Sequence, residues 1–306
     1  MKKWLRAIGF YRGFLLVSFI PVSLGAAVAW QQEGVFYWPI FALALVAVWF
    51  FHAGANLLND YYDHVSGADD NNPVKTPFSG GTLVIQDGLL PPAQIKIAGR
   101  AAFAVGALLF IWLSALTGWP MFLLAVFGFL AGYLYTTRPV WLAYRGWGEL
   151  MIGLAFGPAL VATGEYTQGG RISTEAVLIG VLVGLWAAAI ITINEIPDYV
   201  ADKAAGKRTL VVRFGPQFGL TLWASLLYLS VALLIGGIYI GVLPPQMVIA
   251  LLALLFVIRL TEAARGGVDK LDDLVALCGN TIKSEVFFWA LLLAGLFSSR
   301  LLETVK

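Results

Sequence analysis

Long apolar stretches without any Asp, Glu, Lys or Arg alternate with charged segments along the whole chain. They cover 13–32, 34–59, 101–137, 150–164, 176–194, 214–258 and 286–299. A helix needs about 20 consecutive apolar residues to cross the hydrocarbon of a membrane. Most of these stretches are long enough for that, so the pattern predicts a series of transmembrane helices.

Two stretches are too long for one crossing, and each holds a turn signal midway. The signals are Gly118-Trp119-Pro120 in the first and Leu243-Pro244-Pro245 in the second. Dividing both stretches gives nine helices. Two stretches, 150–164 and 286–299, are short for a full crossing and would need flanking polar residues to span the membrane. If one of them does not cross, the count is eight.

The composition agrees with this pattern. Of the 306 residues, 59% are apolar and 12% are charged, whereas soluble domains have about 25% charged residues. The expected fold is therefore all-α, a polytopic membrane protein of about nine helices. The first apolar stretch has a basic flank but no small-residue cleavage site, so we expect a retained helix rather than a signal peptide. The single cysteine, Cys278, excludes an intramolecular disulfide and a multi-cysteine metal site.

The distribution of basic residues predicts the orientation. With nine alternating helices, 17 of the 20 Lys and Arg residues fall on the face that holds the N-terminus. Loops rich in Lys and Arg stay in the cytoplasm, so this face is expected to be cytoplasmic, in a cell inner (plasma) membrane. Four longer segments on this face hold almost all the acidic residues: roughly 60–96, 138–147, 195–216 and 259–285.

One pattern occurs twice. Asn59 and Asp63 form Asn-x-x-x-Asp, and Asn194 and Asp198 repeat it 135 residues later. Both copies come where a helix with an even number reaches the cytoplasmic face. Four helices per repeat restore the same orientation, so a single transmembrane domain over 1–306 is expected. It would contain a tandem repeat of about 1–140 and 141–265, followed by a last helix.

Each copy belongs to a cluster of acids. On a helix, Asn59 and Asp63 lie one turn apart on one face. Gly67 is expected to end that helix and to leave Asp69 free to fold back. In the second cluster, Pro197 is expected to stop the preceding helix and to start a short one on which Asp198 and Asp202 share a face.

Acids gathered at a membrane boundary repel one another unless a positive charge lies between them. Oxygen ligands without sulfur suit Mg²⁺, which completes its shell with water and substrate phosphates. Close to the second cluster lie three cations that can bind phosphate oxygens, Lys203, Lys207 and Arg208. The clusters therefore predict a Mg²⁺–diphosphate site.

Three other interpretations compete with this site. A single Asp-x-x-x-Asp is more often an ordinary solvated loop whose charges enforce topology, although two copies at equivalent helix ends make that less plausible here. An ion-coupled transporter would place its acids inside the membrane, but these acids lie at helix ends. A structural or assembly factor would leave the paired acids and bases unexplained.

Further segments extend the pattern. They are Asp202 to Leu210, with the sequence Asp-Lys-Ala-Ala-Gly-Lys-Arg-Thr-Leu, then Phe78 to Gly88, Tyr144 to Leu150, and Phe156-Gly157-Pro158. With the two acid clusters, the chain resembles the UbiA superfamily of intramembrane aromatic prenyltransferases, from Arg12 to about Gly215. The segments are most similar to the 1,4-dihydroxy-2-naphthoate polyprenyltransferase branch. This resemblance implies nine helices around a central cavity, with aspartate-rich motifs after the second and sixth.

The resemblance also implies roles for individual residues. One Mg²⁺ would be bound by Asn59, Asp63 and Asp69, and a second by Asn194, Asp198 and Asp202. Four of these, Asn59, Asp63, Asp198 and Asp202, would be catalytic. The residues that would bind the polyprenyl diphosphate, or stabilise the allylic cation through a tyrosine ring, are Lys203, Lys207, Arg208, Lys75, Arg138, Arg12, Tyr135 and Tyr199.

The implied reaction is Mg²⁺-dependent transfer of a prenyl group from polyprenyl diphosphate to an aromatic quinone precursor within the membrane, as in menaquinone biosynthesis. Two segments depart from the naphthoate branch. In Tyr135–Pro139 the chain has Arg138 where that branch is expected to have a small residue. In Asn194–Pro197 it has Glu195 and Pro197 where the branch often has Asn and Arg. The acceptor therefore stays open between 1,4-dihydroxy-2-naphthoate, 4-hydroxybenzoate, a porphyrin-type ring and a glycerol phosphate lipid.

Overall fold

The computed structural model describes residues 1–10, 14–74, 76–78, 81–265, 268 and 270–304. The regular elements within these residues are helices. In chain order they are α1 (Lys2–Ala7), α2 (Phe14–Glu33), α3 (Trp38–Ser66), α4 (Pro92–Thr117), α5 (Trp119–Thr136), η2 (Ala143–Arg145), α6 (Gly148–Leu154), η3 (Ala155–Ala159), α7 (Leu160–Gly169), α8 (Thr174–Ala204), α9 (Leu210–Phe214), α10 (Pro216–Tyr239), η4 (Pro245–Leu252), α11 (Ala253–Arg265) and α12 (Leu271–Thr304).

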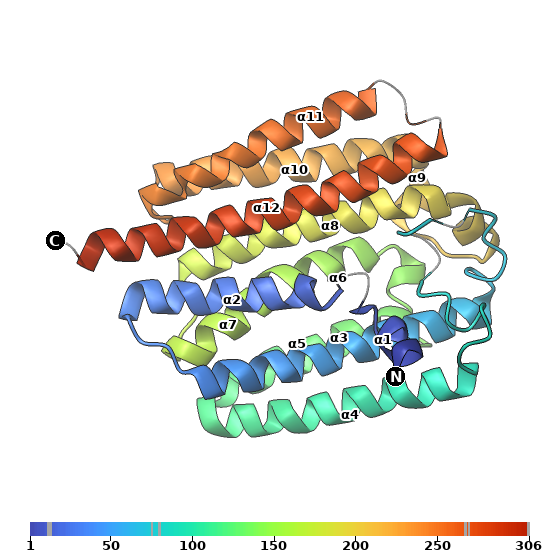
Figure 1. Cartoon of the computed structure of the whole chain (residues 1–306), viewed down its shortest axis with the longest axis horizontal. Coiled ribbons are helices and arrows are strands. Elements are labelled where there is room, and N and C mark those ends of the chain that lie inside the picture. Colours follow the sequence, from blue (N-terminus) through green and yellow to red (C-terminus); the bar gives the residue numbers. More distant parts are fainter. Residues whose placement is uncertain (11–13, 75, 79–80, 266–267, 269, 305–306) are drawn as a thin grey trace.

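The long helices lie side by side along the longest axis of the molecule (Figure 1). Among the described residues, seven helical segments are long and apolar enough to cross a membrane: α3, α4, α5, α8, α10, η4–α11 and α12. Helix α2 and the broken helix α6–η3–α7 run alongside them (Figure 1). The predicted all-α, multi-pass membrane fold is confirmed. The count of nine crossing helices stays a prediction.

Three predicted helix boundaries are confirmed. Gly118 separates α4 from α5 and has a φ of 113°, which only glycine adopts at little cost. The second long stretch is interrupted between Tyr239 and Pro245. Gly67 ends α3 with a φ of 79°, the left-handed conformation typical of a glycine at a helix C-terminus.

Two predicted boundaries are wrong. Pro197 does not stop its helix, because α8 continues to Ala204. A proline leaves the carbonyl one turn before it without its helical partner, and here the thiol of Cys278 on α12 donates to the Ile193 carbonyl at 3.6 Å. Neighbouring side chains of this kind allow proline inside membrane helices. The segment 259–285 is not a long loop either, since α11 reaches Arg265 and α12 starts at Leu271.

Helix α2 joins two apolar cores. Its Val22 and Ala26 belong to a core formed with α3, α4 and α5, whereas its Leu24 and Val28 belong to a core formed with α8, α10, α11 and α12. Backbones touch directly where α2 meets α7. A Cβ atom on Gly25 would collide with the Val161 carbonyl, so only glycine permits this contact.

Candidate functional site

The two acid clusters meet at one end of the bundle. Helices α3 and α8 both end there, on the right in Figure 1. Asn59 and Asp63 share a face of α3 as predicted, and the Asn59 amide donates to the Asp63 carboxylate at 3.1 Å. Asp63 and Asp202 are both 5% exposed. Carboxylates from two distant parts of the chain are thus buried in one region.

The ammonium group of Lys207 lies between the two clusters. Its Nζ is 2.9 Å from Oδ2 of Asp63 and 3.1 Å from Oδ1 of Asp202. Burial lowers the pKa of Lys207, but the charges of Asp63 and Asp202 overcome that effect and raise the pKa well above its usual range. Lys207 therefore stays charged and neutralises part of the carboxylate repulsion.

Tyr144, at the short helix η2, completes the surroundings of Asp63. Its hydroxyl donates to Oδ1 of Asp63 at 2.7 Å and lies 2.6 Å from the Ser66 hydroxyl. Burial, and then the negative charge of Asp63, raise the pKa of Tyr144, so the hydroxyl stays protonated and available as a donor. Sequence reasoning gave Tyr144 no role, although the residue opens one of the segments that carried the resemblance.

The segment between α3 and α4 connects the first cluster to the second. From this segment, the Asn72 amide donates to Oδ1 of Asp198 on α8 at 2.6 Å. Asp69 is 6% exposed. Burial, and next the charge of Asp63, raise its pKa to about 8, although Lys207 opposes this shift. Asp69 therefore folds back towards the cluster as predicted.

The donor atoms here suit a hard divalent cation. They are carboxylate and carboxamide oxygens, and Oδ1 of Asn194 is buried with no hydrogen-bond partner among the described residues. In the part of the chain that the structure describes, no three Asp, Glu, His or Cys side chains converge closely enough to hold a metal ion by themselves. Substrate oxygens would have to complete the shell, together with the oxygens of Asp63 and Asp202 that Lys207 now contacts. The residues present fit Mg²⁺ chemically.

Three predicted substrate-binding cations, Lys203, Arg138 and Arg208, form no ion pair with the acids of this cluster among the described residues. Lys203 is exposed, with its Nζ 5.5 Å from the ring centroid of Tyr199. Arg138 lies over the ring of Trp141 at 4.3 Å. The side chain of Arg208 is exposed. Two further predicted residues, Arg12 and Lys75, fall outside the described residues.

Two further buried acids, Glu149 and Glu195, lie near the acid clusters. Glu149 starts α6 and is 3% exposed, while Glu195 on α8 is 8% exposed. The Leu210 amide donates to Oε1 of Glu149 at 2.6 Å. No donor from the described residues reaches Oε2 of either. Sequence reasoning missed this pair.

The comparisons with known proteins give one consistent picture. A family model described as the UbiA prenyltransferase family matches residues 18–271. A 1,4-dihydroxy-2-naphthoate octaprenyltransferase of Bacillus subtilis is 28% identical over 93% of this chain and 89% of its own length. One from Mycobacterium tuberculosis is 28% identical over 90% of each chain.

A solved structure shares the fold. It is a UbiA homolog from Archaeoglobus fulgidus bound to GPP and Mg²⁺, with a TM-score of 0.68 and 19% identity over 97% of this chain and 99% of that one.

The position of Lys207 leads to a test. Lys207→Met keeps most of the side-chain length but leaves Asp63 and Asp202 without a positive charge between them. Removing one partner of a buried ion pair costs about 3–5 kcal/mol, so the variant should unfold at a clearly lower temperature than wild type in EDTA. Because Mg²⁺ can replace the missing charge, it should raise the unfolding temperature of this variant more than that of wild type.

The matched control is Lys203→Met, which removes an exposed ammonium group from the same segment. Its unfolding temperature should stay close to that of wild type. If Lys207→Met is as stable as wild type in EDTA, or if Mg²⁺ leaves it unchanged, Lys207 does not have this role.

Proposed function

The chain belongs to the UbiA prenyltransferase family, and we propose that this prenyltransferase transfers a polyprenyl group to 1,4-dihydroxy-2-naphthoate or a closely related hydroxylated ring, with Mg²⁺. The observation that carries the proposal is the buried meeting of two acid clusters around one lysine, which lies between Asp63 of α3 and Asp202 of α8. The choice of acceptor is supported by the two octaprenyltransferases that match at least nine tenths of this chain.

In the proposed site, Asn59, Asp63 and Asp69 hold one Mg²⁺, and Asn194, Asp198 and Asp202 hold the other. When bound, these ions neutralise the negative charge of the diphosphate. Two polar neighbours orient the carboxylates: Tyr144 holds Asp63, and Asn72 holds Asp198. Ligands fixed in this way need little rearrangement when substrate arrives.

Lys207 is proposed to bind the diphosphate itself. As the bond between the prenyl carbon and the diphosphate oxygen breaks, negative charge collects on the departing pyrophosphate. An ammonium group already placed there, in a region that excludes water, stabilises this charge more than it would in bulk water.

The allylic cation left behind needs electron-rich surroundings. We assign this role to Tyr135, near the end of α5, because the ring of Tyr199 already faces the ammonium of Lys203.

The acceptor ring is proposed to lie against Glu149 and Glu195. Their Oε2 atoms lack a donor from the described residues, and a buried acceptor without a donor is costly. A ring hydroxyl of the acceptor would supply that donor. The same pair would repel a ring carboxylate, so the carboxylate of a naphthoate would point away from it.

Substitution of the acids tests the site. In Asp63→Asn and Asp198→Asn the side chain keeps its size and loses the charge that binds Mg²⁺. The expected fall in kcat is about 10²–10³-fold, equivalent to about 3–4 kcal/mol, with the fold retained. Asp87→Asn is the control, because Asp87 is an exposed partner of Arg6. The assignment is wrong if either site variant keeps more than about a third of wild-type kcat, or loses activity only by unfolding.

A second experiment tests the acceptor end. Turnover of a panel of acceptors by the wild type should favour 1,4-dihydroxy-2-naphthoate. Glu149→Gln should raise KM for that acceptor about tenfold, equal to about 1.4 kcal/mol of lost binding, and leave KM for the diphosphate within about twofold. An acceptor whose hydroxyl is methylated should bind wild type and variant alike.

Glu165→Gln is the matched control for Glu149→Gln. Glu165 is 0% exposed, accepts from the Ser173 amide at 2.8 Å and has one oxygen without a partner among the described residues. It lies on α7, towards the opposite end of the bundle (Figure 1). Equal KM values of Glu149→Gln and wild type for the acceptor would contradict the proposal that Glu149 and Glu195 bind the acceptor ring.

A further inference from the structure

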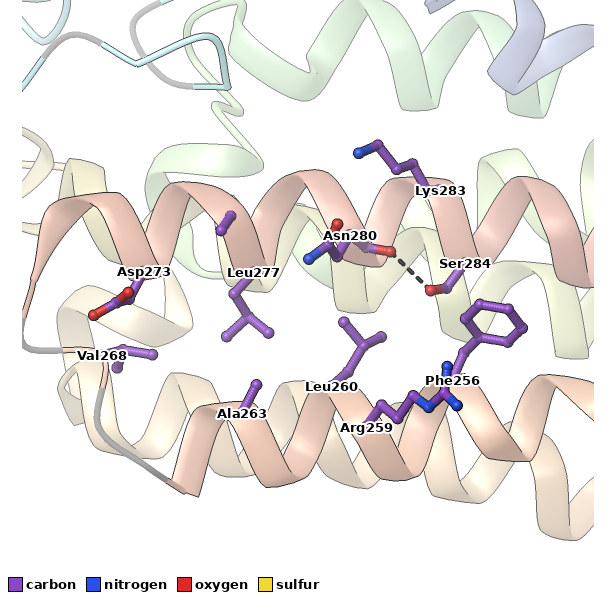
Figure 2. A pocket seen from close by; sticks show the side chains of 11 residues that line it. Phe256, Arg259, Leu260, Ala263, Val268, Asp273, Leu277, Asn280, Lys283 and Ser284 are labelled. Atoms are coloured by element: carbon purple, nitrogen blue, oxygen red, sulfur yellow. Dashed lines mark hydrogen bonds between the residues drawn. The ribbon is translucent and has the colours of Figure 1, made fainter.

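A groove of about 550 Å³ lies between α11 and α12. Its walls are mostly apolar, with Phe256 and Leu260 on α11 and Leu277 on α12. Figure 2 shows these side chains between the two helices. The groove is on a different side of α12 from α8, because Cys278 on the opposite face of α12 contacts Ile193 of α8. It is therefore separate from the region of the acid clusters.

Two positive charges, Arg259 and Lys283, and one carboxylate, Asp273, line this groove within helices long and apolar enough to cross a membrane. Arg259 precedes the end of α11 by six residues, and Lys283 follows the start of α12 by twelve. At 1.5 Å per residue these positions are about 9 Å and about 18 Å from the helix ends. Neither forms an ion pair with a described residue. Charges at such positions usually reach the membrane interface or meet an anion.

Polar groups extend the positive region. Asn280 and Ser284 of α12 line the groove. The Ser284 hydroxyl donates to the backbone carbonyl of Asn280 at 2.8 Å. The side chain of Asn280 is exposed and has no hydrogen-bond partner among the described residues, so its amide is available as a donor. Figure 2 shows Arg259 on α11, across from α12, and Lys283 extending from the edge of α12 that is farther from α11. Hydrogen-bond donors from two helices thus border one apolar groove.

We propose that this groove binds an anionic phospholipid of the membrane. The headgroup phosphate is bound by Arg259 and the Asn280 amide, and Lys283 adds positive charge. One acyl chain lies along Phe256, Leu260 and Leu277. A phospholipid offers both an anion and a hydrocarbon chain, and basic pockets between membrane helices bind such lipids. A net negative lipid such as phosphatidylglycerol is favoured over phosphatidylcholine, because the two cations of the groove outnumber its carboxylate, Asp273, which lies near the start of α12.

The test measures lipid retained by the full chain. Protein from nanodiscs of phosphatidylcholine and phosphatidylglycerol at 3:1 is analysed by native mass spectrometry for bound lipid, and a titration with phosphatidylglycerol gives its Kd. Wild type should retain phosphatidylglycerol selectively. Arg259→Gln and Lys283→Gln should each raise that Kd about fivefold, which corresponds to about 1 kcal/mol per charge. Arg265→Gln, at the end of the same helix and outside the groove, should change it less than twofold.

A second variant covers the case in which these fold poorly. Ala263→Trp fills the groove from an exposed position on α11 without changing its charge, and it should abolish selective retention. Equal retention of both lipids by wild type, an unchanged Kd in Arg259→Gln and Lys283→Gln, or full retention in Ala263→Trp would overturn the proposal. So would displacement of the bound lipid by polyprenyl diphosphate at stoichiometric concentration, because the groove would then belong to the substrate.

Discussion

Carboxylates from two distant parts of the chain are buried at one end of the bundle, and this crowding constrains everything around it. At 3–4 Å, like charges in a medium of low dielectric repel by several kcal/mol. Lys207 relieves that repulsion by binding Asp63 and Asp202 together. The turn after α8 places it there, because the Lys207 amide donates to the Asp202 carbonyl at 2.9 Å and the Arg208 amide to the Tyr144 carbonyl at 3.0 Å. One turn therefore links α8, η2 and α3.

The site lies where the two apolar cores of the protein meet. Leu58, five residues before Asp63 on α3, belongs to one core, and Ile196, two residues before Asp198 on α8, belongs to the other. Each half brings one Asn-x-x-x-Asp motif, and a substrate bound between them would be held by both. The tandem repeat of about 1–140 and 141–265 stays a prediction.

Local patterns in the sequence predicted the helices and the acid clusters, whereas distant contacts could not be predicted. Gly67 and Gly118 act through their own backbone conformation, so sequence alone identified them. The prediction that Pro197 stops its helix was wrong because the effect of this proline depends on Cys278, which is 81 positions further along the chain. The contact of Tyr144 with Asp63 spans 81 positions and that of Asn72 with Asp198 spans 126. Lys203 and Lys207 look alike in sequence, yet the turn buries only Lys207.

The central claim is that these two clusters and Lys207 form one Mg²⁺-dependent diphosphate site. Its most direct test is the Kd of an unreactive polyprenyl diphosphate analogue for the purified protein, measured with Mg²⁺ and again in EDTA. We expect tight binding with Mg²⁺ and a loss of at least about 100-fold in EDTA, since the buried carboxylates would then repel the diphosphate. Equal affinity under both conditions would contradict the claim.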